Sequence, residues 1–144
     1  MIIPDANVLL YAYHAGAVQH ERARRWVEAA FSGTEPVRLP WHCIGAFLRI
    51  ATHPQVFADP YTTVEAVSIV QSWFAAPAVA LIEPGERYWA ILSRLLVDSQ
   101  VRGALVTDAT LAALAIEAGA TVATSDRDFR RFDGLKLLDP IAVA

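Results

Sequence analysis

The sequence predicts an α/β domain in which helices cover both faces of a short, mainly parallel sheet. Short apolar runs typical of strands alternate along the chain with segments of helical length. Parallel strands need crossover connections of that length, so the alternation favours a parallel sheet. The 144 residues are 55% hydrophobic and 19% charged, and no repeat or linker-like segment divides them. We therefore expect a single domain over residues 1–144.

The expected strands are brief apolar runs bounded by Pro, Gly or polar residues. They occupy residues 2–3, 37–39, 79–82, 103–107, 121–124 and 135–138. The segment of residues 53–61 contains Pro54 and Pro60 and is expected to be a loop.

The expected helices carry apolar residues at helical spacing and end at residues that stop helices. Residues 19–31, for example, place on one side the apolar residues Ala23, Trp26, Val27, Ala30 and Phe31, with charged side chains mostly opposite. Pro40 suits the first turn of the next segment, and Gly119 suits a left-handed cap after the last one. The segments are residues 19–31, 41–52, 62–75, 85–98 and 108–118.

Charge and cysteine usage exclude several classes of protein. With 12 basic and 15 acidic side chains the net charge is −3, which argues against broad, non-specific binding of nucleic acid. The single cysteine, Cys43, can form neither an intramolecular disulfide nor a thiolate zinc cage, so we expect a reducing, cytoplasmic location. We expect no signal peptide, since Pro4 and Asp5 break the opening apolar run, and no membrane span.

Three carboxylates follow expected strands directly. Asp5 comes after residues 2–3, Asp108 after 103–107 and Asp126 after 121–124, while Asp128 lies two residues further on. The carboxyl ends of parallel strands meet at one edge of a sheet, where ligands and chemistry collect. If the three strands are neighbours, these acids converge although they are far apart in sequence.

Each acid also has a structural interpretation, because acidic residues commonly cap helices. Asp5 and Asp108 precede helix-forming residues, and Ser125 with Asp128 matches a capping box. A cluster of carboxylates is harder to explain in this way, since like charges repel one another unless a cation binds between them. Oxygen-only ligands favour Mg²⁺ or Mn²⁺, either of which can bind a phosphate oxygen and help to generate an attacking hydroxide.

These segments resemble the motifs of the PIN-domain ribonucleases, and among them the VapC toxins of bacterial toxin-antitoxin pairs. Residues 5–12 are similar to the opening D-x-N-x-L-x-Y motif of the family. Residues 106–115 resemble the helix that carries the third acid of the family, and residues 124–129 resemble the segment of the fourth acid. The resemblance covers nearly the whole chain and implies a three-layer α/β/α PIN-like domain.

The resemblance implies an endoribonuclease that depends on Mg²⁺ or Mn²⁺ and cleaves tRNA or a structured rRNA loop by attack of water on the phosphodiester. It further implies a VapB-like antitoxin as partner, and a homodimer. We assign Asp5 and Asp108 as the principal metal ligands, Asp126 as a further ligand or as the acceptor that orients the water, and Asp128 as the reserve ligand.

Polar residues beside these acids are candidates for supporting roles. Asn7, Thr107 and Ser125 can hold waters or a phosphate oxygen, although bonding within turns and caps explains them equally well. Arg127, Arg130 and Arg131 adjoin the fourth-acid segment and are candidates for contacts with RNA phosphates.

The chain departs from the family pattern at one acidic position. The family commonly has a glutamate on the helix after the second strand, where this chain has Ala46. The departure weakens the case for two metals and leaves open a catalytically impaired PIN domain that only binds RNA or an antitoxin. An aspartyl phosphatase is a further alternative, but that chemistry usually requires a second Asp at the position of Asn7.

Overall fold

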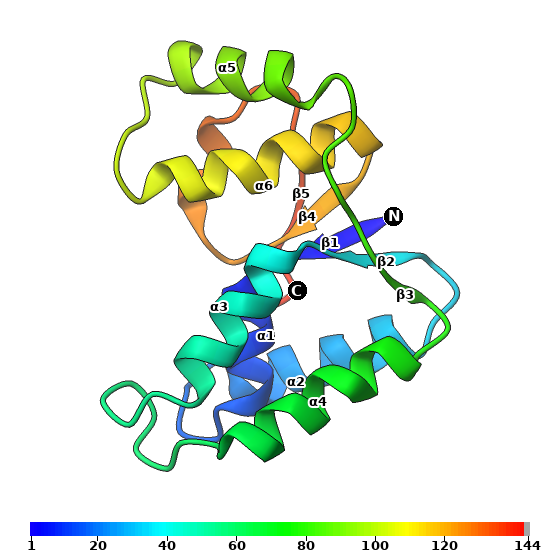
Figure 1. The fold of residues 1–144 in the computed structure, drawn as a ribbon, viewed down its shortest axis with the longest axis vertical. Helices are drawn as coiled ribbons and strands as arrows, with labels where there is room; N and C mark the ends of the chain where they lie inside the picture. Colours follow the sequence, from blue (N-terminus) through cyan, green and yellow to red (C-terminus); the bar gives the residue numbers. More distant parts are fainter. Residues whose placement is uncertain (143–144) are drawn as a thin grey trace.

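A parallel five-stranded sheet with the order β3-β2-β1-β4-β5 forms the centre of the computed structural model, which describes residues 1–142 (Figure 1). Every neighbouring pair of strands is parallel, as predicted. Each strand is three residues long: β1 (Ile2–Pro4), β2 (Val37–Leu39), β3 (Val79–Leu81), β4 (Thr121–Ala123) and β5 (Lys136–Leu138).

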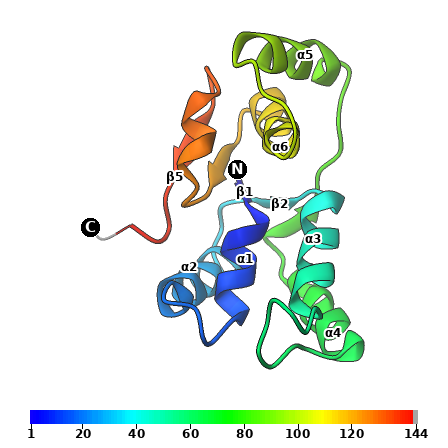
Figure 2. The same ribbon diagram turned by 90° about the vertical axis from the view of Figure 1, so that its left-hand side faces the viewer.

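Helices lie on both sides of this sheet and complete the predicted three-layer arrangement. One layer contains α1 (Ala6–Tyr13), α2 (His20–Phe31), α3 (Trp41–Ala51) and α4 (Thr63–Ala75). The opposite layer contains α5 (Tyr88–Asp98) and α6 (Leu105–Ala118), and a short 3₁₀ helix, η1 (Arg127–Arg131), precedes β5. Figures 1 and 2 show the two layers on opposite sides of the sheet. The predicted α/β fold class is confirmed.

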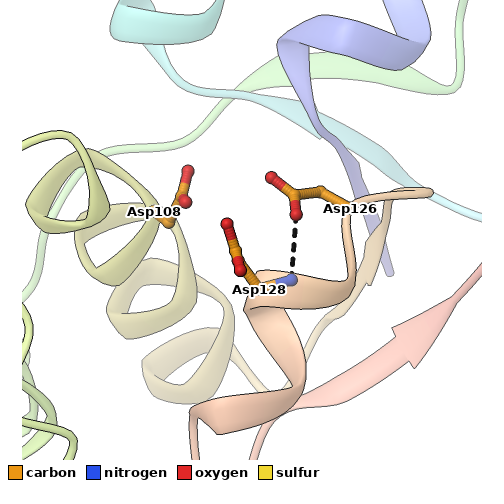
Figure 3. A group of neighbouring side chains, drawn as sticks. All are labelled: Asp108, Asp126 and Asp128. Carbon is orange, nitrogen blue, oxygen red and sulfur yellow. Dashed lines mark hydrogen bonds between the residues drawn. The ribbon is translucent and has the colours of Figure 1, made fainter.

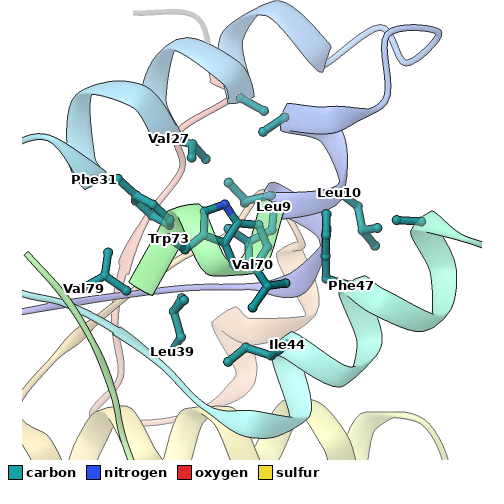
Figure 4. Packing of buried hydrophobic residues seen from close by; sticks show 14 of the residues in the cluster. Leu9, Leu10, Val27, Phe31, Leu39, Ile44, Phe47, Val70, Trp73 and Val79 are labelled. Carbon is teal, nitrogen blue, oxygen red and sulfur yellow. The ribbon is translucent and has the colours of Figure 1, made fainter. Parts of the chain in front are cut away.

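Trp73 of α4 is the largest side chain of the core beneath the sheet, where it is 2% exposed (Figure 4). Its ring packs edge-on against Phe47 with a centroid distance of 4.7 Å, and against Phe31 at 6.2 Å. Its indole Nε1 donates a 3.0 Å hydrogen bond to the hydroxyl of Tyr13, so the buried polar atom is satisfied. The packing of Trp73 therefore joins α1, α2, α3 and α4 in one hydrophobic cluster.

On the other face, α6 presents small residues to the sheet. Ala109, Ala112 and Ala113 are fully buried in a cluster that includes Ile3 of β1 and Val122 of β4. Without long side chains in between, the helix lies close to the strands.

The carboxyl end of α6 is tied to the segment that precedes α5. The two carboxylate oxygens of Glu117 accept hydrogen bonds from the backbone N–H groups of Gly85, at 2.6 Å, and Arg87, at 2.8 Å. A Cβ at Gly85 would come within 2.8 Å of this carboxylate. These bonds hold the turn before α5, which begins at Tyr88, three residues later than the predicted start at residue 85.

The prediction of a strand at residues 103–107 is wrong. This apolar run belongs to the first turn of α6, which begins at Leu105 and ends, as predicted, before Gly119 with φ +68°. A short apolar run fits a strand and a buried helix equally well, and here it continues into the alanine- and leucine-rich segment that forms the helix. Asp108 therefore lies in α6, not after a strand.

The other predicted strands and helices lie within a few residues of their predicted positions. The helix α1 is not among the predicted segments. This eight-residue helix buries Val8, Leu9, Leu10 and Ala12, so its sequence has no polar face to reveal the helical period. Residues 53–61 form the expected loop between α3 and α4. Within residues 1–142 no helix is long and apolar enough to cross a membrane.

We expect the variant Trp73→Ala to lower the free energy of unfolding by about 3–5 kcal/mol, because it leaves a large cavity among four helices. The matched control is Trp89→Ala, since Trp89 on α5 is 67% exposed, and its effect should stay within about 0.5 kcal/mol. Urea unfolding followed by circular dichroism measures both values. Equal destabilisation by the two variants would contradict the placement of Trp73 in the core.

Candidate metal centre

Asp5 stands between β1 and α1, at the edge where the strands end. Its backbone N–H donates to the carbonyl of Ala123 at 2.9 Å, and its Oδ2 accepts a 3.0 Å hydrogen bond from Thr124 Oγ1. Asp5 occupies the N-cap position of α1, but within the described chain its side chain makes no capping hydrogen bond. The carboxylate is therefore hydrogen-bonded to the neighbouring strand segment, while the first backbone amides of α1 lie near enough to favour its charged form.

Pairing of β1 with β4 brings Asp5 and Thr124 together. The register joins Ile3 to Val122 and Pro4 to Ala123, so the next residue of each strand segment reaches the same edge. Thr124 is buried, with 5% of its surface exposed, and its Oγ1 also accepts the backbone N–H of Asp126 at 3.0 Å. One hydroxyl thus links two acids that are 121 positions apart.

Asp108, Asp126 and Asp128 form a compact group, here called the carboxylate triad (Figure 3). One oxygen of each lies within 4.8 Å of the oxygens of the others. Asp108 comes from α6, whereas Asp126 and Asp128 come from the start of η1. Asp5 is not a member of the triad, so the structure gathers three of the four predicted ligands, while the fourth is hydrogen-bonded to Thr124.

Asp126 also caps η1, as its structural interpretation allows. Its Oδ1 accepts the backbone N–H of Asp128 at 2.9 Å. The cap is Asp126 and not Ser125, so the capping box expected from Ser125 and Asp128 is wrong by one residue. In Figure 3 the second oxygen of Asp126 is turned toward Asp108. The same side chain can therefore shape the turn and face a ligand.

Repulsion among the acids leaves a clear electrostatic signature. Burial, and after it the charges of Asp126, Asp5 and Asp128, together raise the pKa of Asp108 to about 6, while Arg131 acts in the opposite direction. Burial and the charge of Asp126 also raise the pKa of Asp5, against the lowering effects of the Thr124 hydrogen bond and of the first backbone amides of α1. The site concentrates negative charge that the protein only partly neutralises.

The donor set matches a hard divalent cation. All atoms of the carboxylate triad that face one another are oxygens, the ligands that Mg²⁺ and Mn²⁺ prefer. Burial raises the pKa of the nearby Cys43 thiol to about 12, so that sulfur stays protonated and is no ligand for a soft metal. A bound cation would also relieve the repulsion among the acids.

The predicted supporting residues lie around the acids in different ways. Arg131 pairs with Asp128, with 3.3 Å between Nη2 and Oδ1. Arg127 and Arg130 line a hollow of about 180 Å³ beside Ser125, on the η1 side of the site. Asn7 and Thr107 are exposed, in the first turns of α1 and α6 respectively.

A cavity of about 240 Å³ lies on the other side of the acids, between α3 and α6. Asp5 and Ala6 line it together with Thr107, Asp108 and Leu111 of α6, and α3 contributes the rest. Ala46 is among those α3 residues, so the position that the resemblance assigns to a glutamate does face the acids but brings no ligand atom. We call this space the α3–α6 cavity; its α3 lining consists of His42, Cys43, Gly45, Ala46 and Arg49.

Sequence reasoning missed Thr124 and Arg49 as parts of the site. Thr124 stands inside the expected strand of residues 121–124, and its signal is the Thr-Ser-Asp sequence directly after a buried run. Arg49 stands three residues after Ala46, which is one helical turn, so it lies on the same face of α3. The contact of Thr124 with Asp5 depends on the pairing of β1 with β4, and the position of Arg49 depends on the packing of α3 beside the strand ends. Neither can be seen in the local sequence.

Comparison with known protein families gives one strong match. Residues 2–135 match the model of the PIN domain. Ribonuclease VapC37 of Mycobacterium tuberculosis is 40% identical over 143 residues, with 99% of both chains covered. Ribonuclease VapC33 of the same species is 41% identical over 141 residues, covering 98% of this chain and 99% of that protein.

Solved structures of the same fold are more distant in sequence. FitAB bound to an IR36 DNA fragment contains a chain with a TM-score of 0.72 at 18% identity, with coverage of 100% of this chain and 98% of that one. VapBC2 from Rickettsia felis, bound to a DNA fragment from its promoter, has a TM-score of 0.69 at 15% identity, covering 96% and 98%. VapC20 of M. tuberculosis, a toxin that cleaves the sarcin-ricin loop, has a TM-score of 0.66 at 19% identity, covering 94% and 99%.

We expect Asp108→Asn to stabilise the metal-free protein at pH 7.5 by about 1 kcal/mol, a value discounted for the solvent screening of a partly exposed carboxylate. A carboxyl whose pKa is raised by folding destabilises the folded state when it is ionised, and this effect grows as the pH rises from about 4 to about 6. The increase in the free energy of unfolding that Asp108→Asn gives should therefore be largest above pH 6 and should shrink toward pH 4.

Urea unfolding in EDTA at pH 7.5 and pH 4.5 measures this effect. Asp59→Asn is the matched control, because Asp59 is an exposed carboxylate in the loop between α3 and α4. A loss of stability in Asp108→Asn at pH 7.5 would show that the acids do not repel one another as described.

Proposed function

The chain belongs to the PIN-domain family and, within it, to the VapC ribonucleases, and on this premise we propose that it is an endoribonuclease that uses Mg²⁺ or Mn²⁺ to hydrolyse RNA. The observation that carries the proposal is the carboxylate triad at the strand ends, with Asp5 fixed beside it by Thr124. A structural role explains the capping bond of Asp126 but not the approach of Asp108 from another layer of the fold.

Asp5 and Asp108 would be the principal ligands of the cation, directly or through water, with Asp126 and Asp128 of the carboxylate triad as further ligands. When bound, the cation supplies charge neutralisation at the phosphate and lowers the pKa of water. The second oxygen of Asp126, the one not committed to the amide of Asp128, accepts a hydrogen bond from the attacking water and orients it. The water oxygen attacks phosphorus and gives up a proton, through Asp126, to solvent, while the bond to the 3′ oxygen breaks and that oxygen takes up a proton from solvent; the products are a 5′-phosphate and a 3′-hydroxyl.

The basic residues of η1 are placed to hold the RNA backbone. Arg127 and Arg130 line the hollow next to Asp126, so phosphates adjacent to the cleaved one can bind there. Arg131 is already paired with Asp128, and its contribution is to limit the charge of the triad. RNA contact is thereby confined to one edge of a protein whose net charge is −3.

We propose tRNA or a structured rRNA loop as the substrate, a VapB-like antitoxin as the partner, and a homodimer as the assembly. The cleavage of the sarcin-ricin loop by VapC20 supports an rRNA target as one of the two options. The VapBC2 complex of R. felis supports the antitoxin.

A catalytically impaired PIN domain is the second candidate, and Ala46 favours it. The position faces the acids from α3 and brings only a methyl group, so the site has one carboxylate fewer than the family pattern. Three grouped carboxylates still suffice for a hydrated Mg²⁺, which usually keeps several of its waters. For this reason we favour the active enzyme.

We expect Asp126→Asn to reduce cleavage of total tRNA and rRNA in Mg²⁺ by at least about 100-fold, because it removes both a ligand charge and the acceptor for the water. The same variant should lose the rise in Tm that Mg²⁺ gives to the unchanged protein. Asp133→Asn, an exposed acid just after η1, is the matched control and should behave like the unchanged protein. Cleavage that resists EDTA, or that persists in Asp126→Asn, would contradict the metal assignment.

We expect the double variant Arg127→Ala and Arg130→Ala to flatten the salt dependence of RNA binding, with the slope of log K against log salt falling by about 1 to 2. Two phosphate contacts, each releasing a counterion, account for this change. The charge-matched control is Arg22→Ala with Arg25→Ala on α2, in the layer opposite α6. An equal change of slope in both double variants would assign the effect to net charge alone.

A further inference from the structure

The α3–α6 cavity has a lining that the metal site does not require. Asp5 and Asp108 form its acidic side, while Gly45, Ala46 and Leu111 give it apolar walls. Its volume of about 240 Å³ is just below the roughly 300–1,000 Å³ of pockets that enclose drug-sized ligands. The space therefore suits a group of the size of one ring system.

Arg49 gives this cavity a positive charge opposite the acids. It is exposed and lies on the cavity-facing side of α3. Among residues 1–142, no ion pair or side-chain hydrogen bond involves its guanidinium. Of the other side chains that α3 contributes, Ala46 is apolar, burial lowers the pKa of His42 and so favours its neutral form, and the Cys43 thiol is protonated. An arginine without a partner at the rim of a cavity is a ready site for a phosphate.

We propose that the α3–α6 cavity receives one unpaired nucleotide of the RNA, next to the cleaved phosphodiester, while Arg49 binds the following phosphate. This inference rests on the proposed function. When the cleaved phosphate lies at Asp108, one neighbouring nucleotide must extend toward η1 and the other toward α3. The apolar walls receive the ring of that second nucleotide, and the guanidinium neutralises its phosphate.

The occupant must be unpaired, because a cavity lined from two helices can enclose a base only after that base has left its stack. Sequence-specific recognition of RNA commonly uses such splayed bases in loops and bulges. The substrate class that follows is a loop or single-stranded segment, rather than the interior of a duplex. A cationic side chain of a protein partner is the competing occupant, attracted by Asp5 and Asp108 but repelled by Arg49.

Gly45→Leu tests the cavity by filling it. A Cβ built on Gly45 meets no atom within 4 Å, and replacing a glycine within a helix favours folding, so the variant should fold. Ala90→Leu is the matched enlargement on an exposed position of α5, away from the cavity. Arg49→Gln tests the phosphate contact, and Arg94→Gln on α5 removes the same charge elsewhere.

The first measurement is the binding of a fluorescein-labelled RNA stem-loop in EDTA, followed by anisotropy, because it needs neither metal nor cleavage. We expect Arg49→Gln and Gly45→Leu to weaken binding by about tenfold, and the controls to change it less than about twofold. The same stem-loop with its loop closed into a duplex should bind weakly to every variant. Equal binding of the four variants, or stronger binding to the duplex, overturns the cavity as a nucleotide site.

The second measurement maps cleavage positions in a pool of RNA stem-loops with random loops in Mg²⁺. Gly45→Leu should change the base preference at one position beside the cut, and the Mg²⁺-induced rise in Tm should stay unchanged. If the unchanged protein binds the stem-loop through Arg49 yet never cleaves it, the proposed function fails and the cavity stands. If cleavage is normal in Gly45→Leu and Arg49→Gln, the cavity proposal fails and the proposed function stands. In that case, a loss of antitoxin binding in both variants would assign the cavity to the protein partner.

Discussion

The hydroxyl of Thr124 is the interaction on which the site depends. It donates to Asp5 and accepts from the amide of Asp126, so it fixes the side chain of one acid and the backbone of another. Both contacts follow from the pairing of β1 with β4, in which Pro4 stands opposite Ala123. Three ladder positions in the middle of the sheet therefore set the relative placement of residues at the two ends of the chain.

Folding assembles a charge distribution that is unfavourable by itself. Four acids gather at one edge, and the pKa of Asp108 is raised mainly by burial and then by its acidic neighbours. The remainder of the chain has 12 basic and 11 acidic residues once these four are set aside from the 15, a net charge of +1. Much of the net negative charge of the protein therefore lies at this one edge of the sheet. Hydrophobic cores on both faces of the sheet, around Trp73 on one and around the alanines of α6 on the other, hold this arrangement together.

Much of the fold could be predicted from the sequence, because the alternation of short apolar runs and helical segments is a local signal. Asp5 and Asp126 were placed correctly at strand ends for the same reason. Asp108 was assigned to the site for a wrong structural reason: the short apolar run of residues 104–106 fits a strand as well as a helix, and only the packing of the folded chain makes residues 105–107 the first turn of α6. Thr124 and Arg49 escaped prediction because their roles arise from contacts between segments that no local pattern relates.

The alanines of α6 have a consequence for the spacing of the acids. Asp108 reaches the carboxylate triad from a helix, while Asp126 and Asp128 lie just after the end of β4. Ala109, Ala112 and Ala113 are fully buried in the cluster that joins this helix to the sheet. Larger side chains there would move the helix outward and carry Asp108 away from the other two acids, since a packed interior transmits such changes rather than absorbing them. Three buried methyl groups outside the triad thus help to set how far apart its carboxylates stand.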